Sequence, residues 1–204
     1  MTPEYIVIHT AAFRGKNCDA DTIDRWHRAR GWSGIGYHFV ILNNRHKDKA
    51  DGTLEKGREL SRMGAHARGI NHRSVGICCI GHGDYDDFTD AQKTTLFQLV
   101  NRLMTQFDIP IEKVIGHREI NSLVDQGVVS SSYRTSKSCP GNKVDMHQIR
   151  EAIAEPETNL SPETHAALIE ALQLLEENQS VFANAQDELR EFLTHPEVME
   201  FKAE

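Results

Sequence analysis

The chain has 204 residues, of which 39% are hydrophobic and 26% are charged. This composition is typical of a globular protein and excludes wholesale disorder, and the length suffices for one well-cored domain with an appendage. No apolar run reaches the roughly 18 residues of a membrane span, and the N-terminus lacks the basic and apolar regions of a signal peptide. We therefore expect synthesis in the cytoplasm and no membrane insertion.

Charge divides the chain near residue 155. Residues 155–204 hold twelve acidic and two basic residues, a net of −10, which leaves +3 for the rest of a chain whose total is −7. This asymmetry predicts two regions, a domain at 1–154 and an acidic C-terminal extension at 155–204, which its own sequence pattern predicts to be helical. The first part is too weakly basic to indicate nucleic acid binding.

The first half alternates between strand and helix patterns. Residues 5–10 form a short apolar run typical of a buried strand, and helical spacing follows from Asp19 or Asp21 to Gly31. Residues 36–44 return to strand. Residues 46–60 predict a hairpin with its turn at Asp51-Gly52.

The second half continues the pattern after a loop at 64–74. Residues 74–81 predict a buried strand, on which the adjacent Cys78 and Cys79 point to opposite faces. Thr89 is the expected N-cap of a long amphipathic helix. A short strand at 113–120, a loop at 121–144 and a helix at 145–153 complete the domain. This order predicts an α/β fold with a mixed central β-sheet flanked by helices.

The extension shows a different repeat. Pro162 marks a helix start, and large apolar residues then recur every seven positions at Leu168, Leu175, Phe182 and Leu189. Such a seam predicts packing or a homo-oligomer through the C-terminal helices, with a separate protein partner as the alternative.

Three scattered residues suggest the chemistry. His9 and His117 each end a short strand, and the ends of neighbouring strands meet at one edge of a sheet. Cys139, in "TSKSCPG", follows 22 residues after His117. Two imidazoles and a thiolate make a zinc set with one open position, suited to hydrolysis of an amide or ester. On residue types alone, two unrelated histidines and a buried cysteine remain an equal alternative.

Five segments, in order, carry a resemblance to a known family: "YIVIHTAA", "IDRWHRARGWSGIGYHFVI", "GAHARGINHRSVGICCIG", "IGHREI" and "KSCPG". Over residues 4–152 the chain resembles the zinc-dependent N-acetylmuramoyl-L-alanine amidases, above all the amidase-type lysozymes of bacteriophages and the peptidoglycan recognition proteins. The resemblance implies a peptidoglycan hydrolase that uses a zinc-activated water to cleave the amide between N-acetylmuramic acid and the L-alanine of the stem peptide.

The resemblance also implies residue roles. One zinc ion per chain would be held by His9, His117 and Cys139. Tyr37 and Lys137 match the catalytic residues: the hydroxyl can hold the water or donate to the developing oxyanion, and the ammonium can stabilise that oxyanion.

Further residues extend the expected site. His66, Asn71 and His72 are candidates for substrate binding, with a polar-capped surface loop as the alternative. Arg118 and Glu119 are expected to orient the loop that carries His117.

The expected biological role is that of a phage or prophage endolysin, made in the cytoplasm and released to the cell wall in a holin-dependent manner. The alternatives are a cytosolic amidase that recycles muropeptides, whose relatives usually have Asp in place of Cys139, and a non-catalytic peptidoglycan-binding module, which typically lacks that cysteine. A toxin delivered to rival cells is not separated from an endolysin by the sequence.

Overall fold

The computed structural model describes residues 1–154 together with residues 170, 173 and 174. The chain divides into two units, residues 1–155 and 156–204. The heptad seam predicted at 161–195 lies almost wholly outside the described residues. The boundary near residue 155 and the role of the extension therefore stay predictions.

Five strands form one mixed sheet in the order β3–β2–β4–β1–β5. Their bounds are β1 (Tyr5–Thr10), β2 (Phe39–Ile41), β3 (Leu54–Lys56), β4 (Ser74–Cys79) and β5 (Val114–Gly116). β1 lies between β4 and β5 and is parallel to both, β2 is parallel to β4, and β3 is antiparallel to β2 at one edge. The predicted mixed α/β sheet is confirmed.

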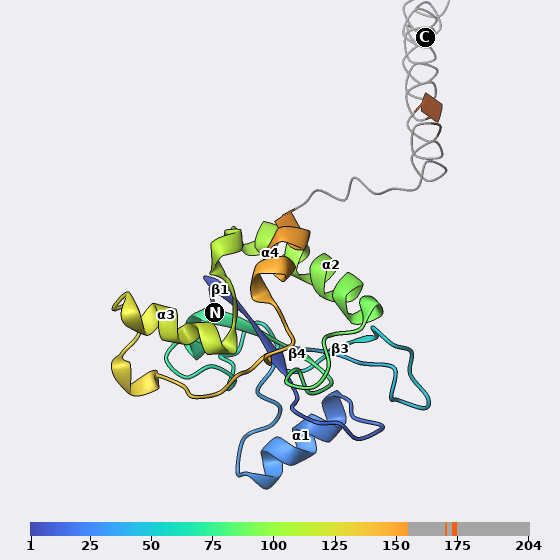
Figure 1. Cartoon of the computed structure of the whole chain (residues 1–204), viewed down its shortest axis with the longest axis horizontal. Coiled ribbons are helices and arrows are strands. Elements are labelled where there is room, and N and C mark those ends of the chain that lie inside the picture. The colour runs from blue at the N-terminus through green and yellow to red at the C-terminus, as the bar shows by residue number, and fades with distance from the viewer. Residues whose placement is uncertain (155–169, 171–172, 175–204) are drawn as a thin grey trace, which may run out of the picture. The chain divides into compact units, whose positions relative to one another are not determined.

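Helices cover both faces of this sheet (Figure 1). They are α1 (Ala20–Ala29), α2 (Asp90–Phe107), α3 (Ile120–Asp125) and α4 (Met146–Ala154). α1 begins at its N-cap Asp19, whose carboxylate accepts the backbone N–H of Thr22. α2 begins with a reciprocal capping box between Thr89 and Gln92. The prediction that Thr89 is the N-cap is thereby confirmed.

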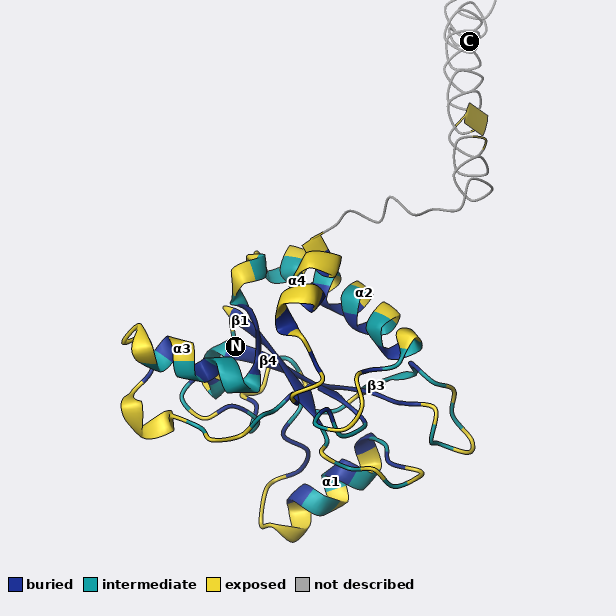
Figure 2. Ribbon diagram, viewed as in Figure 1, coloured by how far each residue is buried: buried dark blue, intermediate teal, exposed yellow. Residues whose placement is uncertain are grey.

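The central strands β1 and β4, drawn dark blue as buried in Figure 2, separate three apolar clusters. One face of the sheet packs against α2 and α4, with Leu96, Leu99 and Ile149 in that core. The opposite face carries two smaller clusters, one with Ile120 and Leu123 of α3 and the other with Ile23 of α1. The adjacent cysteines lie on opposite faces, as predicted: Cys78 packs with α1 and Cys79 with α2.

Two sequence predictions are wrong in detail. The partner of β3 is β2, twelve residues earlier, and not the segment at 46–50, which forms no strand. The segment predicted as loop at 121–144 begins inside α3 and also contains a 3-10 turn at Ser131–Tyr133. Both misses concern short elements, whose formation depends on tertiary packing more than on local pattern.

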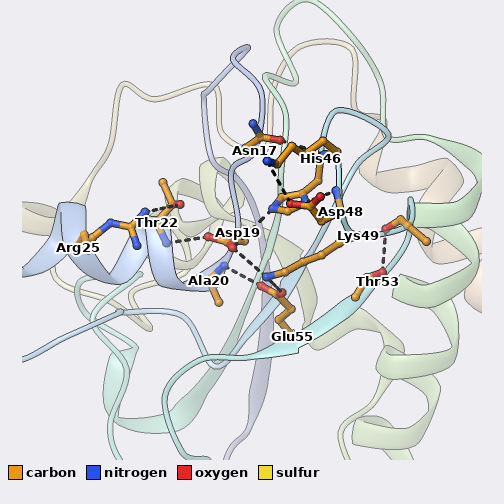
Figure 3. A network of polar contacts seen from close by, with 12 residues as sticks. Asn17, Asp19, Ala20, Thr22, Arg25, His46, Asp48, Lys49, Thr53 and Glu55 are labelled. Carbon is orange, nitrogen blue, oxygen red and sulfur yellow. Dashed lines mark hydrogen bonds and ion pairs between the residues drawn. The ribbon is translucent and has the colours of Figure 1, made fainter.

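A polar network explains the conformation of the 46–50 segment (Figure 3). Nζ of Lys49 lies 2.8 Å from an oxygen of Asp19 and 2.5 Å from an oxygen of Glu55. The other oxygen of Glu55 accepts the backbone N–H of Ala20, at 2.8 Å. The side chain of Lys49 therefore joins this segment to the start of α1 and to β3, in place of a strand ladder.

Candidate active site

Two strand ends bring the predicted histidines together. In the β1–β5 ladder Ile8 pairs with Gly116, so His9 and His117 follow at the same edge of the sheet. Their ring centroids lie 4.8 Å apart. His9 is only 1% exposed. Because side chains alternate along a strand, His9 shares the face of Val7, which is the face covered by α1 and α3.

Cys139 reaches the same edge from the loop between α3 and α4. Its Sγ lies 3.6 Å from Nδ1 of His9. One ligand atom from each of His9, His117 and Cys139 lies within 4.8 Å of the other two, and within residues 1–154 no other group of histidine, cysteine and carboxylate side chains meets this condition. The fold thus assembles the three residues that the sequence had left scattered.

Arg118 holds the loop that carries Cys139. Its backbone N–H donates to the carbonyl of Cys139 at 2.7 Å. Its half-buried guanidinium donates to three further carbonyls of that loop, those of Ser138 at 3.1 Å, Gly141 at 2.6 Å and Val144 at 2.8 Å. One residue therefore couples the position of His117, its chain neighbour, to that of Cys139.

The loop after β4 supports Cys139 from a second direction. The carboxylate of Asp84 accepts the hydroxyl of Ser138 and the backbone N–H of Asn142, each at 2.8 Å. At Gly83 a Cβ atom would lie 1.9 Å from the carbonyl oxygen of Pro140. The two loops thus pack backbone against backbone, which only glycine permits at this position.

The turn that carries His117 is tied to α4. A carboxylate oxygen of Glu119 accepts the backbone N–H of Gly116 at 2.8 Å. The same carboxylate accepts hydrogen bonds from both terminal nitrogens of the Arg150 guanidinium, at 2.9 and 3.1 Å. A bidentate pair of this kind fixes orientation as well as distance. The hydrogen bonds expected of Arg118 and Glu119 are present, although Arg118 acts on the Cys139 loop.

The predicted catalytic residues lie at the same site. The ring of Tyr37, just before β2, has its centroid 5.1 Å from that of His9. Burial raises the pKa of Tyr37 well above its usual value, and the neighbouring thiols of Cys78 and Cys139 raise it further. The phenol is therefore neutral and able to donate a hydrogen bond. Lys137 is exposed, two residues before Cys139, and its charge acts on all three predicted ligands.

Burial sets the protonation of the three predicted ligands. It lowers the pKa of His9 well below the usual value, with the charges of His117, His66 and Lys137 acting in the same direction. It lowers the pKa of His117 to about 4, again helped by Lys137. Burial raises the pKa of the Cys139 thiol to about 11, against the effect of nearby positive charges. Both imidazoles are thus neutral near pH 7, the form in which histidine binds a metal.

The three expected substrate residues lie in different environments. Nδ1 of His66 is 3.1 Å from Nε2 of His9, inside the site. The side-chain oxygen of Asn71 accepts the backbone N–H groups of His66 and Ala67, at 2.9 and 2.7 Å, and so shapes the loop. His72 is exposed. Contact of any of them with substrate stays a prediction.

Comparison with known proteins addresses the identity of this site. Residues 1–142 match the family model described as N-acetylmuramoyl-L-alanine amidase. The chain belongs to this amidase family. The match covers more than two thirds of the chain and contains every predicted site residue from His9 to Cys139.

Individual relatives of the amidase agree with this assignment. An endolysin of Enterobacteria phage T3 is 37% identical over 113 residues, which cover 52% of this chain and 70% of the relative. Peptidoglycan-recognition protein SC2 of Drosophila melanogaster is 31% identical over 128 residues, covering 58% of this chain and 65% of that protein. The solved amidase LysC of Clostridium intestinale superposes with a TM-score of 0.61 at 31% identity, covering 74% of this chain and 85% of LysC. The protein is a peptidoglycan amidase with the fold of LysC, and its predicted hydrolase activity is confirmed.

Proposed function

We propose that this amidase is a zinc enzyme in which His9, His117 and Cys139 hold one ion. The observation that carries the proposal is the convergence of their ligand atoms within 4.8 Å of one another. Neutral imidazole and cysteine sulfur suit zinc, and three protein ligands are the pattern of catalytic sites. When bound, zinc supplies Lewis-acid chemistry, since it polarises a carbonyl and lowers the pKa of water to near neutrality.

The side chains around this set have separate tasks. The Tyr37 hydroxyl stays protonated because burial raises its pKa, so it donates a hydrogen bond to an oxygen of the reacting group. The exposed ammonium of Lys137 approaches the amide from the open side and stabilises the oxyanion that forms as the carbonyl is attacked.

The proposed substrate bond is the amide between N-acetylmuramic acid and L-alanine, and the proposed role is that of an endolysin. Relatives from phage T3 and from Escherichia phage T7 bear that name and are each 37% identical to this chain. Among the described residues no helix is both long and apolar enough to cross a membrane. The enzyme would be made in the cytoplasm and reach the wall through a holin-dependent membrane lesion.

The experiment digests purified sacculi with three samples: wild type, Cys139→Ala, and wild type stripped with EDTA and then reloaded with zinc. The proposal expects new L-alanine amino termini without new reducing sugar ends, loss of activity in the variant and in the stripped sample, and recovery on reloading. Cys18→Ala is the matched control, because Cys18 is likewise a free cysteine but is buried in the α1 cluster. Full activity of Cys139→Ala would contradict the zinc site.

The same assay separates the alternative functions. A muropeptide-recycling amidase would release little from intact sacculi but would cleave soluble muropeptides. A binding module would sediment with sacculi and release nothing. The presence of Cys139 beside both histidines favours the endolysin over both alternatives.

For the extension at 155–204 we propose self-association through its apolar seam. Light scattering of the full chain and of a chain ending at residue 155 tests this directly. A mass of one chain for both would reject the homo-oligomer and leave a protein partner as the remaining proposal.

A further inference from the structure

His66 contacts the most buried of the predicted ligands from the side opposite Cys139. Nε2 of His9 lies 3.1 Å from Nδ1 of His66, while Nδ1 of His9 lies 3.6 Å from Sγ of Cys139. The two rings meet edge to face, with centroids 5.1 Å apart. Each nitrogen of His9 therefore has its own partner, and the two partners lie on opposite sides of the ring.

The ring of His66 sits in a slot formed by two glycines. A Cβ atom at Gly64 or at Gly76 would come within 2.5 Å of ring carbons of His66. Gly76 lies within β4 and pairs with Val7 of β1. Since real Cβ atoms do not approach so closely, the slot exists only because both positions lack a side chain. The backbone of the sheet thus fixes where His66 lies.

A metal ion bound at Nδ1 of His9 would select one tautomer of His9 and of His66. A nitrogen that binds a metal must offer its lone pair, so with zinc held on the side of Cys139, Nδ1 of His9 would be bare and Nε2 would carry the hydrogen. That hydrogen is donated to Nδ1 of His66, whose own hydrogen is then on Nε2. Nε2 of His66 is buried and has no hydrogen-bond partner of good geometry among the described residues, although the backbone of Ser74 lies close enough to the ring to favour its protonated form. His66 thus offers His9 a hydrogen-bond acceptor, while the N–H at Nε2 of His66 itself lacks a well-placed acceptor.

We propose that His66 is a positioning residue for the metal ligand His9: it accepts the N–H of His9, selects the tautomer with a free Nδ1 and fixes the rotation of the ring. This inference rests on the proposed zinc site. Outer hydrogen-bond partners of ligating histidines are most often carboxylates, backbone carbonyls or water, and here a second histidine has that place. With one nitrogen used and the other buried, His66 serves His9 in this proposal and not the substrate.

The test compares two nearly isosteric substitutions, His66→Asn and His66→Leu. The side-chain oxygen of Asn can replace Nδ1 as an acceptor, and Leu cannot. Zinc affinity of the full chain is measured by competition with a coloured chelator. We expect His66→Leu to bind zinc about 10- to 100-fold more weakly than wild type and His66→Asn to stay close to wild type. His147→Leu, on the exposed face of α4, controls for the loss of a histidine.

Two spectroscopic readouts separate positioning from simple packing. In cobalt-loaded protein the visible bands report ligand geometry, and they should shift in His66→Leu but not in His66→Asn. In the zinc-loaded wild type, nitrogen-15 NMR should show the hydrogen of His9 on Nε2, a result that requires no variant to fold.

Each outcome decides the question. Failure of the wild type to bind zinc would reject the proposed function itself. Wild-type binding with equal affinity in His66→Leu, equal weakening of both His66 variants, or a His9 hydrogen on Nδ1 would overturn the positioning role alone.

Discussion

Removal of the Arg118 side chain should destabilise the protein more than removal of an exposed charged side chain does. Arg118→Ala deletes three hydrogen bonds from a guanidinium to carbonyls of the Cys139 loop, at 2.6 to 3.1 Å. A hydrogen bond to a charged group contributes roughly 1.5–3 kcal/mol. Because water can replace part of this at a half-buried site, and because the three bonds are not additive, we expect a loss of about 2–4 kcal/mol.

Two measurements on zinc-free and zinc-loaded protein test this prediction. Urea unfolding should show that Arg118→Ala is less stable than wild type. Its zinc affinity should also be lower, because the loop that carries Cys139 loses the hydrogen bonds that hold it. Arg134→Ala is the matched control: Arg134 pairs with Asp125 on the surface, with side chains 50% and 64% exposed. Such a pair contributes about 0–1 kcal/mol. The reasoning is refuted if the two variants lose equal stability, or if Arg118→Ala binds zinc like wild type.

Three further predictions concern protonation, charge and backbone contact. Burial lowers the pKa of His117 to about 4 and of His66 to about 3, so below the unfolded value near 6.5 the unfolded chain binds more protons than the folded one. The free energy of unfolding of the zinc-free protein should therefore fall by up to about 1.4 kcal/mol per pH unit for each such histidine as the pH falls from 6.5 toward 4. Urea unfolding that gives the same stability at each pH would contradict this. Lys49→Met leaves two partly buried carboxylates without their cation and should lower the stability by about 2–4 kcal/mol. Lys47→Met, at a side chain 74% exposed, is the control and should lower it by under about 1 kcal/mol. Equal losses on thermal unfolding would show that the network in Figure 3 does not stabilise the protein. Gly83→Ala adds a Cβ 1.9 Å from a backbone oxygen of the Cys139 loop. The variant should bind zinc more weakly than wild type, while circular dichroism shows the same helix content. Unchanged zinc affinity would mean that the loop shifts freely.

The long periodic elements were predictable because their signals are local. The Thr89 cap and the apolar face of α2 lie within a few turns of one helix, and β1 and β4 are continuous apolar runs. Short elements were harder. β3 has three residues, and its partner is β2 across a loop of twelve. The adjacent polar segment does not pair with β3; instead its Lys49 binds the carboxylates of Asp19 and Glu55.

The sequence by itself determined the residue types of the site and the family pattern that links them. His9, His117 and Cys139 were identifiable because two strand ends and one Pro-Gly turn carry them in the family's order. Only the tertiary structure decided what surrounds them. His66 lies 57 positions from His9, and Arg118 reaches carbonyls 20 to 26 positions away. Contacts of this kind follow from strand register and loop packing, which bring distant residues together without any local periodic signal.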